Sequence, residues 1–256
     1  MTDATVRYEV ANGIARILLD RPPVNALDFD MIRSIVAALE RTAKDDTVRA
    51  VVLTSAVPNR FCAGLDLKIL LGKSETKVRD FLHELYIRLH DAQYNLGKPS
   101  IAAVAGAARG GGMTLAISCD VIIAGAGATF GYPEIDVGVI PAIHFAHLPR
   151  IIGRHRAFEL LFSGRSFDAE KACRLGLVSR IVPDTEVETA ALALAKTFGA
   201  KSPTIMRLGR AAFIRQNDLD YRRSIAAAVE DFINVTMTDA AQEGLRAFVE
   251  KRSPRN

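Results

Sequence analysis

The residues best suited to chemistry lie in a run of three glycines, Gly110-Gly111-Gly112. The run separates a strand-like stretch from a helical one, so it falls at a helix N-terminus. There the backbone N–H groups lack intrahelical partners, and the helix dipole favours negative charge. Missing Cβ atoms would let a ligand approach the backbone closely. The alternative reading is structural, with the glycines allowing a helix to pack tightly on a strand. The run is neither a P-loop nor a G-x-G-x-x-G fingerprint.

A second segment, Phe61-Cys62-Ala63-Gly64-Leu65-Asp66, follows a buried strand pattern over residues 48–54. Its Ala-Gly pair precedes a helical start and again exposes N–H groups. The two segments together predict the backbone anion site of a soluble enzyme.

The elements that must position these segments follow from apolar spacing. Two short runs around Asn12-Gly13 predict a β-hairpin over residues 6–19. Asp28 is expected to cap a helix, since apolar residues recur at helical spacing after it. Residues 75–96 read as one long amphipathic helix. Strands are expected at 101–105 and 120–124, with a helix at 113–119 between them. This alternation favours an α/β sheet with right-handed crossovers.

After Pro141 the pattern is almost entirely helical, apart from a short apolar stretch over 178–182. Asp168 is a further expected N-cap. Helical spacing recurs over 192–198, 204–213, 221–235 and 240–249. We therefore expect a core over residues 1–200 and a helical C-terminal region over 201–256. The latter has more apolar faces than one sheet covers, so it is expected to pack on a partner subunit too.

Composition narrows the class of protein. The 256 residues suit one large domain, and a net charge of +4 from scattered basic residues is no nucleic-acid signature. The three cysteines lie far apart in the sequence, which argues against a disulfide framework and a zinc site. This use of cysteine suits a reducing cytoplasm. No signal peptide and no run able to span a bilayer are found. The expected location is cytoplasmic, with no membrane, nucleic-acid or metal partner.

Many short motifs, from about Val6 to the C-terminus, match one family in order. They are Arg21-Pro22, Asn25-Ala26-Leu27, Phe61-Cys62-Ala63-Gly64-Leu65-Asp66-Leu67-Lys68, Lys98-Pro99-Ser100-Ile101-Ala102-Ala103-Val104, Gly110-Gly111-Gly112, Cys119-Asp120, Phe130-Gly131-Tyr132-Pro133-Glu134, Gly138-Val139-Ile140-Pro141, Gly164-Arg165, Ala169, Ala172 and Gly176-Leu177-Val178. On these residues the chain resembles the crotonase superfamily of enoyl-CoA hydratases and isomerases.

The resemblance implies an α/β fold: a crotonase-like spiral of ββα units, followed by helices used in trimer contacts. Trimers of this family often pair into hexamers. It implies an oxyanion hole, in which the N–H groups of Leu65 and Gly111 hold the thioester oxygen. Losing one such donor typically costs roughly 3–4 kcal/mol of transition-state stabilisation. The substrate would be a coenzyme A thioester, with no other cofactor. Its CoA part would lie along Ala63, Gly64, Asp66, Leu67 and Lys68, although Lys68 also fits a plain solvated residue.

The sequence departs from the family pattern at the catalytic carboxylates. Hydratases carry two glutamates that hold a water, and here the first position is Thr114 while the second is Glu134. A hydroxyl is far too weak a base to replace a carboxylate. A further acid found in some members would fall at Ala142. Members with one carboxylate are typically Δ3,Δ2-enoyl-CoA isomerases, so Glu134 is the expected proton carrier, with its pKa raised by an apolar pocket. Its structural alternative is a helix-start carboxylate.

The loop after Pro141 departs too, because His144 and His147 stand where hydratases have a glycine-rich stretch. Either histidine could titrate near neutral pH, but a structural role is the commoner one. Cys62 is taken as packing. Leu70, Leu71, Phe81 and Leu85 would either line an acyl pocket or belong to the core.

Three functions stay open at this point. The first is an acyl-CoA enzyme that stabilises an enolate, with isomerisation favoured over hydration. The second is a non-catalytic acyl-CoA-binding protein that has kept the fold without the chemistry. The third, RNA binding, is disfavoured by the scattered basic residues.

Overall fold

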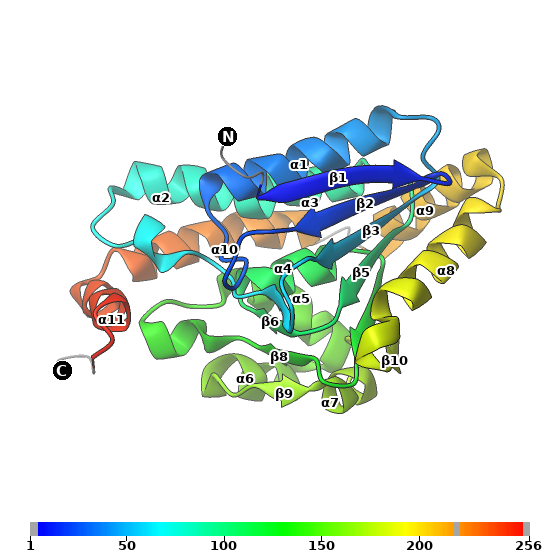
Figure 1. Cartoon of the computed structure of the whole chain (residues 1–256). Coiled ribbons are helices and arrows are strands. Elements are labelled where there is room, and N and C mark those ends of the chain that lie inside the picture. The colour runs from blue at the N-terminus through cyan, green and yellow to red at the C-terminus, as the bar shows by residue number, and fades with distance from the viewer. Residues whose placement is uncertain (1–4, 218–220, 253–256) are drawn as a thin grey trace.

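A computed structural model describes residues 5–217 and 221–252 (Figure 1). Its larger sheet has six strands in the order β1-β2-β3-β5-β7-β10. The predicted hairpin is observed as the antiparallel pair β1–β2, and the other neighbours pair in parallel. The strands are β1 (Val6–Ala11), β2 (Ile14–Leu19), β3 (Ala50–Ser55), β5 (Ser100–Val104), β7 (Val121–Gly125) and β10 (Arg180–Val182).

A second sheet of four short strands has the order β4-β6-β8-β9. The strands are β4 (Arg60–Cys62), β6 (Ala107–Arg109), β8 (Thr129–Gly131) and β9 (Phe167–Asp168). The first three run parallel to one another, and β9 is antiparallel to β8. Sequence analysis missed this sheet, because strands this short carry no readable alternation of apolar and polar residues.

The two sheets are joined by a repeated unit. Each of the strands β3, β5 and β7 leads directly into a strand of the small sheet, β4, β6 or β8, and then into helical structure. The helices that follow are α2 (Glu75–Leu82), α4 (Gly111–Ser118) and α5 (Ala142–Ile152), with the 3-10 turns η1 (Leu67–Ile69) and η3 (Pro133–Val137) preceding α2 and α5. The expected spiral of ββα units is therefore present.

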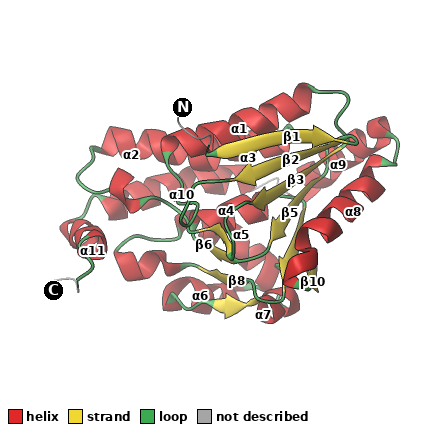
Figure 2. Cartoon of the chain, viewed as in Figure 1, coloured by secondary structure: helices red, strands yellow, loops and turns green. Residues whose placement is uncertain are grey.

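Side-chain alternation along the large sheet divides the core into two layers. On β3, Ala50 and Val52 face α8 (Val187–Gly199), whose Val187, Ala191 and Ala195 pack on them. Val51 and Leu53 belong to the main core on the opposite face. There α1 (Phe29–Lys44) buries the apolar stripe that the sequence predicted. The helices α1 and α8 flank the strands of this sheet (Figure 2).

Two predicted N-caps are confirmed. The Asp28 carboxylate accepts a hydrogen bond from the Met31 N–H at the start of α1. The Asp168 carboxylate accepts from the Lys171 N–H at the start of α7 (Ala169–Arg174). Each cap satisfies an N–H group that the first helical turn leaves without a partner.

The helix expected over 75–96 is interrupted by a wider turn. It consists of α2, a π-helical segment η2 (His83–Arg88) and α3 (Leu89–Tyr94). Phe81, Leu85 and Leu89 are all buried, as predicted. A π turn adds a residue to the helix, so it rotates the side chains after it, and such turns are frequent at functional sites. Apolar spacing alone does not reveal it.

The C-terminal helices share the main core. Buried residues of α10, among them Ile225 and Phe232, join it, and so does Leu245 of α11. The remaining elements of the region after Pro141 are α6 (Arg154–Ser163), η4 (Asp184–Glu186), α9 (Pro203–Asn217), α10 (Tyr221–Thr236) and α11 (Asp239–Val249). The division at residue 200 and the trimer contacts stay predictions.

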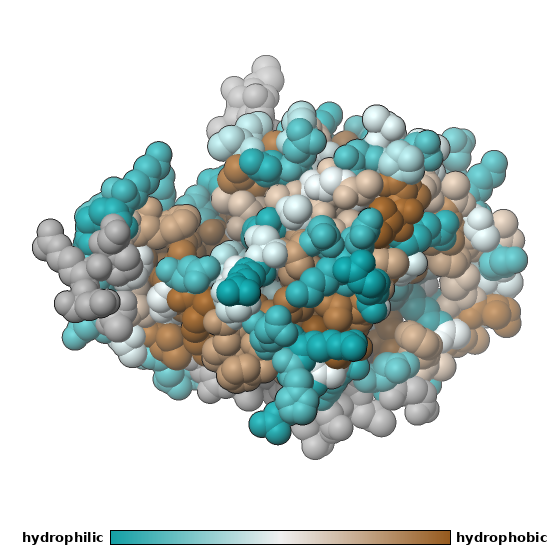
Figure 3. Space-filling view, turned by 90° about the horizontal axis from the view of Figure 1, so that it is seen from below, coloured by the Kyte–Doolittle hydropathy of each residue, from teal (hydrophilic) through white to brown (hydrophobic). Residues whose placement is uncertain are grey.

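Some large apolar side chains stay at the surface. Phe158 of α6 is 61% exposed, and Ile205 and Phe213 of α9 are 68% and 70% exposed. Seen from below, the surface shows brown apolar areas broken by teal polar ones (Figure 3). Within the described residues, no helix is both long and apolar enough to cross a membrane.

The contact between α4 and β4 leaves no room for a side chain. A Cβ on Gly112 would lie 2.3 Å from the Cys62 carbonyl oxygen. We expect Gly112→Ala to destabilise the protein by at least about 2 kcal/mol, because overpacking costs about that much. Gly209→Ala in α9 is the control, since nothing lies within 4 Å of its Cβ position. Urea unfolding measures both, and equal midpoints would contradict the close contact.

Candidate active site

Three loops meet at one edge of the small sheet. Strands β4, β6 and β8 are parallel neighbours, with Cys62 opposite Ala108 and Arg109 opposite Gly131. The carboxyl ends of parallel strands lie at the same edge, which is where ligands bind in open α/β sheets. The loops after these strands carry the two glycine segments and Glu134. The structure therefore brings together the three predicted parts of the site.

The first glycine segment presents the N–H of Leu65. Leu65 forms an isolated parallel bridge with Leu27. The bridge uses the groups on either side of Leu65: the Leu27 N–H donates to the Gly64 carbonyl at 2.7 Å, and the Asp66 N–H donates to the Leu27 carbonyl at 2.9 Å. In this pattern the N–H of Leu65 itself points away from Leu27. It is thus available to a ligand on the other side.

The second glycine segment touches the first. A Cβ on Gly64 would lie 3.2 Å from the Gly111 nitrogen and 2.9 Å from the Arg109 carbonyl oxygen. Gly64 also has φ +91°, a conformation that L side chains rarely adopt. Gly111 is the first residue of α4, so its N–H has no acceptor within the helix. Two backbone donors therefore lie on adjoining segments with no side chain between them.

The three glycines of the triplet have different contacts in the structure. Gly110 has φ +48°, and a Cβ there would lie 2.9 Å from Oε1 of Glu134. Gly111 supplies a free N–H beside Gly64, and Gly112 packs against Cys62. Gly112 therefore agrees with the packing interpretation of the triplet, whereas binding of an anion at Gly111 stays a prediction.

A cavity of about 220 Å³ opens over these segments. Its polar lining comes from the two glycine segments, Asp66 and Glu134. The apolar lining includes Val24, Ala26, Leu65, Leu67, Val137, Val139 and Phe248. Concave, mostly apolar sites with a few polar groups are typical of small-molecule binding.

Glu134 lies in η3 and is only 8% exposed. Its Oε2 is buried and has no hydrogen-bond partner among the described residues. Burial penalises the charged form and raises the pKa of Glu134 to about 7, while a hydrogen bond with its own backbone opposes this more weakly. The burial of Glu134 agrees with the expected rise in its pKa. A carboxyl group with this pKa takes up and releases a proton near neutral pH.

The other carboxylate of the cavity has a different environment. Oδ2 of Asp66 lies 3.1 Å from Nη2 of Arg21, and Oδ1 accepts a bond from the Lys68 N–H at 3.3 Å. Arg21 also donates to the Ala26 carbonyl at 2.7 Å. Asp66 is therefore tied into the loop. Among the described residues that line the cavity, Glu134 is the carboxylate without a cationic partner.

The segment expected to bind CoA follows the first glycine loop. Ala63, Gly64, Asp66 and Leu67 line the cavity, and Lys68 is exposed one residue further along. Their role toward CoA stays a prediction.

Thr114 lies one turn into α4 and is 5% exposed. The described residues lining the Glu134 cavity do not include it. Its Oγ1 lies 3.4 Å from Nε2 of His144, which is 1% exposed. Burial lowers the pKa of His144 to about 3, so the imidazole is neutral at physiological pH. Thr114 and His144 are therefore in contact, and both stand at positions where the sequence departs from the family pattern.

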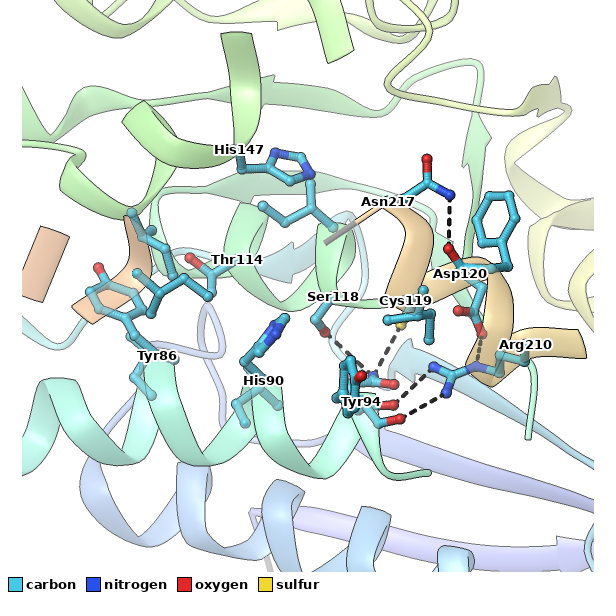
Figure 4. A pocket seen from close by; sticks show the side chains of 18 residues that line it. Tyr86, His90, Tyr94, Thr114, Ser118, Cys119, Asp120, His147, Arg210 and Asn217 are labelled. Atoms are coloured by element: carbon cyan, nitrogen blue, oxygen red, sulfur yellow. Dashed lines mark hydrogen bonds and ion pairs between the residues drawn. The ribbon is translucent and has the colours of Figure 1, made fainter. Parts of the chain in front are cut away.

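A second cavity, of about 230 Å³, lies between η2, α3, α4, α5 and α9 (Figure 4). Thr114, Leu85 and His147 line it, and burial lowers the pKa of His147 to about 4. At its other end Nε of Arg210 lies 2.8 Å from Oδ2 of Asp120, and Nη2 donates to a backbone carbonyl of α3. The ion pair ties α9 to the residue before β7, and the hydrogen bond ties α9 to α3.

Several sequence assignments change little in the structure. Cys62 is fully buried, its Sγ lies 3.0 Å from the Asn25 carbonyl, and burial raises its pKa to about 12, so it is packing as expected. Leu70, Phe81 and Leu85 are fully buried in the core, and Leu85 also lines the second cavity.

Some residues of the site were missed. Phe248 of α11 lines the cavity, although more than a hundred residues separate it from the glycine segments. Val137 and Val139 line the cavity together with Glu134. Val139 belongs to a recognised motif and Val137 precedes it, but neither residue was assigned a role. Only their position beside Glu134 would have pointed to them.

A buried carboxyl group that faces two free backbone N–H groups fits proton transfer beside a carbonyl whose oxygen gains negative charge. Comparison with known proteins agrees with this class. The sequence model of the family described as Enoyl-CoA hydratase/isomerase matches residues 9–256. The chain therefore belongs to the enoyl-CoA hydratase/isomerase family.

Individual relatives show how close the likeness is. The chain is 36% identical over 250 residues to mouse "Enoyl-CoA hydratase domain-containing protein 2, mitochondrial", covering 95% of this chain and 84% of the relative. It is 34% identical over 236 residues to human "Methylglutaconyl-CoA hydratase, mitochondrial", covering 90% and 69%. The structure of human mitochondrial delta3-delta2-enoyl-CoA isomerase superposes with a TM-score of 0.87 at 26% identity, covering 96% and 97%.

The raised pKa of Glu134 predicts a stability effect. As pH rises from its ordinary pKa of 4.5 to about 7, the unfolded chain releases this proton while the folded protein keeps it, so stability falls. Glu134→Gln lacks this loss and should unfold at a higher temperature than the parent above pH 7. The difference should shrink toward pH 4. Exposed Glu170→Gln is the control, and a pH-independent difference for Glu134→Gln would contradict the burial argument.

Proposed function

We propose that the protein is an enoyl-CoA isomerase that moves a double bond between the 3 and 2 positions of an acyl-CoA. The observation that carries this proposal is Glu134, a buried carboxyl group without a partner carboxylate, beside two glycine segments that offer free N–H groups. One acid–base group suffices for isomerisation, since the proton that leaves one carbon returns to another.

The proposed reaction begins with ionised Glu134. Its carboxylate removes a proton from C2 of a 3-enoyl-CoA, and the C–H electron pair forms a dienolate with negative charge on the thioester oxygen. The N–H groups of Leu65 and Gly111 hold that oxygen. Protonated Glu134 then returns the proton to C4, and the 2-enoyl-CoA forms without net gain or loss of a proton.

The electrostatics support both halves of this cycle. A pKa near 7 lets Glu134 act as base and then as acid at neutral pH. Backbone donors pre-organised in a site sheltered from water are worth about 10²–10³ in rate each. The CoA part is placed along Ala63 to Lys68, and the scheme requires no other cofactor and no metal.

Hydration is the second candidate, and the names of the relatives favour it. The human protein above is named as a hydratase, and the mouse protein is named as containing an enoyl-CoA hydratase domain. Hydration of a 2-enoyl-CoA requires a base and an acid for water. In this chain Glu134 would need help from the Thr114 hydroxyl, which cannot accept a proton at neutral pH. A binding protein without catalysis is the third candidate.

Assembly as a homotrimer or hexamer is part of the proposal. Ile205, Leu208 and Phe213 are exposed on α9, and an oligomer would cover such apolar side chains.

Turnover of a 3-enoyl-CoA tests Glu134 directly. Glu134→Gln keeps the shape of the side chain but cannot take a proton, so kcat should fall by about 10²–10⁴. Product is followed by absorbance of the conjugated thioester, with Glu170→Gln as the control. Full activity of Glu134→Gln would remove this residue from the mechanism. Formation of 3-hydroxyacyl-CoA from 2-enoyl-CoA at ordinary enzymatic rates would favour the hydratase. Binding of acyl-CoA without turnover would favour the non-catalytic binding protein.

The pH dependence of kcat/KM gives a separate prediction. Glu134 must be ionised to start the reaction, and its pKa is about 7. The value of kcat/KM should rise about tenfold per pH unit below that pKa and level off above it. A profile that is flat from pH 5 to 8 would contradict Glu134 as the base.

A further inference from the structure

His144 is placed against the second glycine segment from the first turn of α5. Its ring packs on Tyr132, with ring centroids 4.6 Å apart and planes inclined at 59°. Its Nε2 lies 3.3 Å from the Gly110 carbonyl oxygen. His144 is not among the described residues that line the Glu134 cavity, so it reaches that cavity only through Gly110.

The partner of Nε2 fixes the tautomer of His144. A carbonyl oxygen only accepts hydrogen bonds, so its contact with Nε2 is a hydrogen bond when Nε2 carries the proton. The other tautomer would turn a lone pair toward the carbonyl and leave a buried N–H at Nδ1 without a partner among the described residues. With the proton on Nε2, Nδ1 is bare, and it is buried without a hydrogen-bond partner among the described residues. A second proton on Nδ1 would bury an unpaired charge, which agrees with the low pKa of this ring. His144 is therefore a permanent neutral donor.

The carbonyl that His144 contacts shares a peptide group with the N–H of Gly111. A peptide group is planar and trans, so its C=O and N–H point in opposite directions. Holding the Gly110 carbonyl therefore fixes the direction of the Gly111 N–H. Without a Cβ, Gly110 rotates more freely than other residues, and its ψ of −114° sets the tilt of this plane.

Two donors converge on that carbonyl. The Thr114 N–H donates to it at 3.1 Å within α4, and Nε2 of His144 approaches it from α5 at 3.3 Å. The first bond belongs to the helix ladder. The second comes from another element, so it restrains the peptide relative to the rest of the site. Donation to the carbonyl also polarises the peptide and strengthens its N–H as a donor.

We propose that His144 is a positioning residue that aims the Gly111 N–H at the thioester oxygen. This inference rests on the proposed function, because it assigns His144 to the oxyanion hole of that reaction. The Thr114 side chain also contacts this ring, since its Oγ1 lies 3.4 Å from the same Nε2. A glutamate at 114 would compete for the Nε2 proton and draw the ring away from Gly110.

The test compares two variants of similar length. The His144→Gln variant carries an amide N–H close to the place of Nε2, whereas His144→Met fills similar space without a donor. Both are made in the Glu134→Gln background, so that the probe is bound but not converted. The probe is 2,4-hexadienoyl-CoA, whose conjugated thioester absorbs at longer wavelength when its carbonyl is polarised. His147→Met, in the same helix but toward the second cavity, is the control.

We expect the absorbance of the probe to shift to longer wavelength when it binds to the Glu134→Gln variant. This red shift should be at most half as large when His144→Met is added to that variant. Dissociation constants should stay within about threefold of each other, and His144→Gln should restore most of the shift. With Glu134 intact, His144→Met should lower kcat at least tenfold with little change in KM, since removing a whole donor costs about 10²–10³. His147→Met should leave the red shift unchanged.

The outcomes separate the two proposals. An unchanged red shift in His144→Met, or equal loss in the Gln and Met variants despite bound probe, would overturn the role of His144 while the oxyanion hole stands. Bound probe with no red shift even in Glu134→Gln alone would overturn the oxyanion hole itself. If His144→Met does not fold, His144→Gln provides the test. The proposal requires that His144→Gln keep the red shift and kcat. Loss of both from a folded protein would overturn the positioning role of His144.

Discussion

Parallel pairing of three very short strands is the constraint on which the whole site depends. Strands β4, β6 and β8 bring their carboxyl ends to one edge, and each is followed at once by a functional segment. Each of these three strands follows directly after a strand of the large sheet, namely β3, β5 or β7. Local hydrogen bonds over two or three residues would not hold such strands alone, so the packed core supplies the stability. The glycines then allow the loops to approach within van der Waals contact.

The features that would suit this site to catalysis lower the stability of the folded protein. A carboxyl group buried without a cation and backbone N–H groups left without acceptors both cost folding free energy. Val137 and Val139 line the cavity beside Glu134, and burial raises the pKa of this carboxyl group to about 7. Asp66 shows the opposite arrangement, because its ion pair with Arg21 holds the loop in place. Two carboxyl groups of one cavity thus have different surroundings: Asp66 is paired with Arg21, and Glu134 is buried without a cation.

Much of this arrangement was predictable from the sequence. Asn12-Gly13 indicated the hairpin, and Asp28 and Asp168 indicated helix starts, because these signals depend on neighbouring residues alone. The ordered motifs carried the family and the spiral of ββα units. The small sheet was not predictable, since its strands pair across dozens of residues and are too short for a pattern. The same holds for Phe248, for the link between Arg21 and Asp66, and for the contact between His144 and Gly110.

The central claim is that two backbone N–H groups hold a thioester oxygen while Glu134 alone moves the proton. A crystal structure of the Glu134→Gln variant with bound 3-enoyl-CoA tests it most directly. The account predicts the thioester oxygen within about 3 Å of both the Leu65 and Gly111 nitrogens, which is the usual reach of such donors. It also predicts the side chain of residue 134 against C2 of the acyl chain. A thioester oxygen that contacts neither nitrogen, or a C2 atom remote from residue 134, would contradict it.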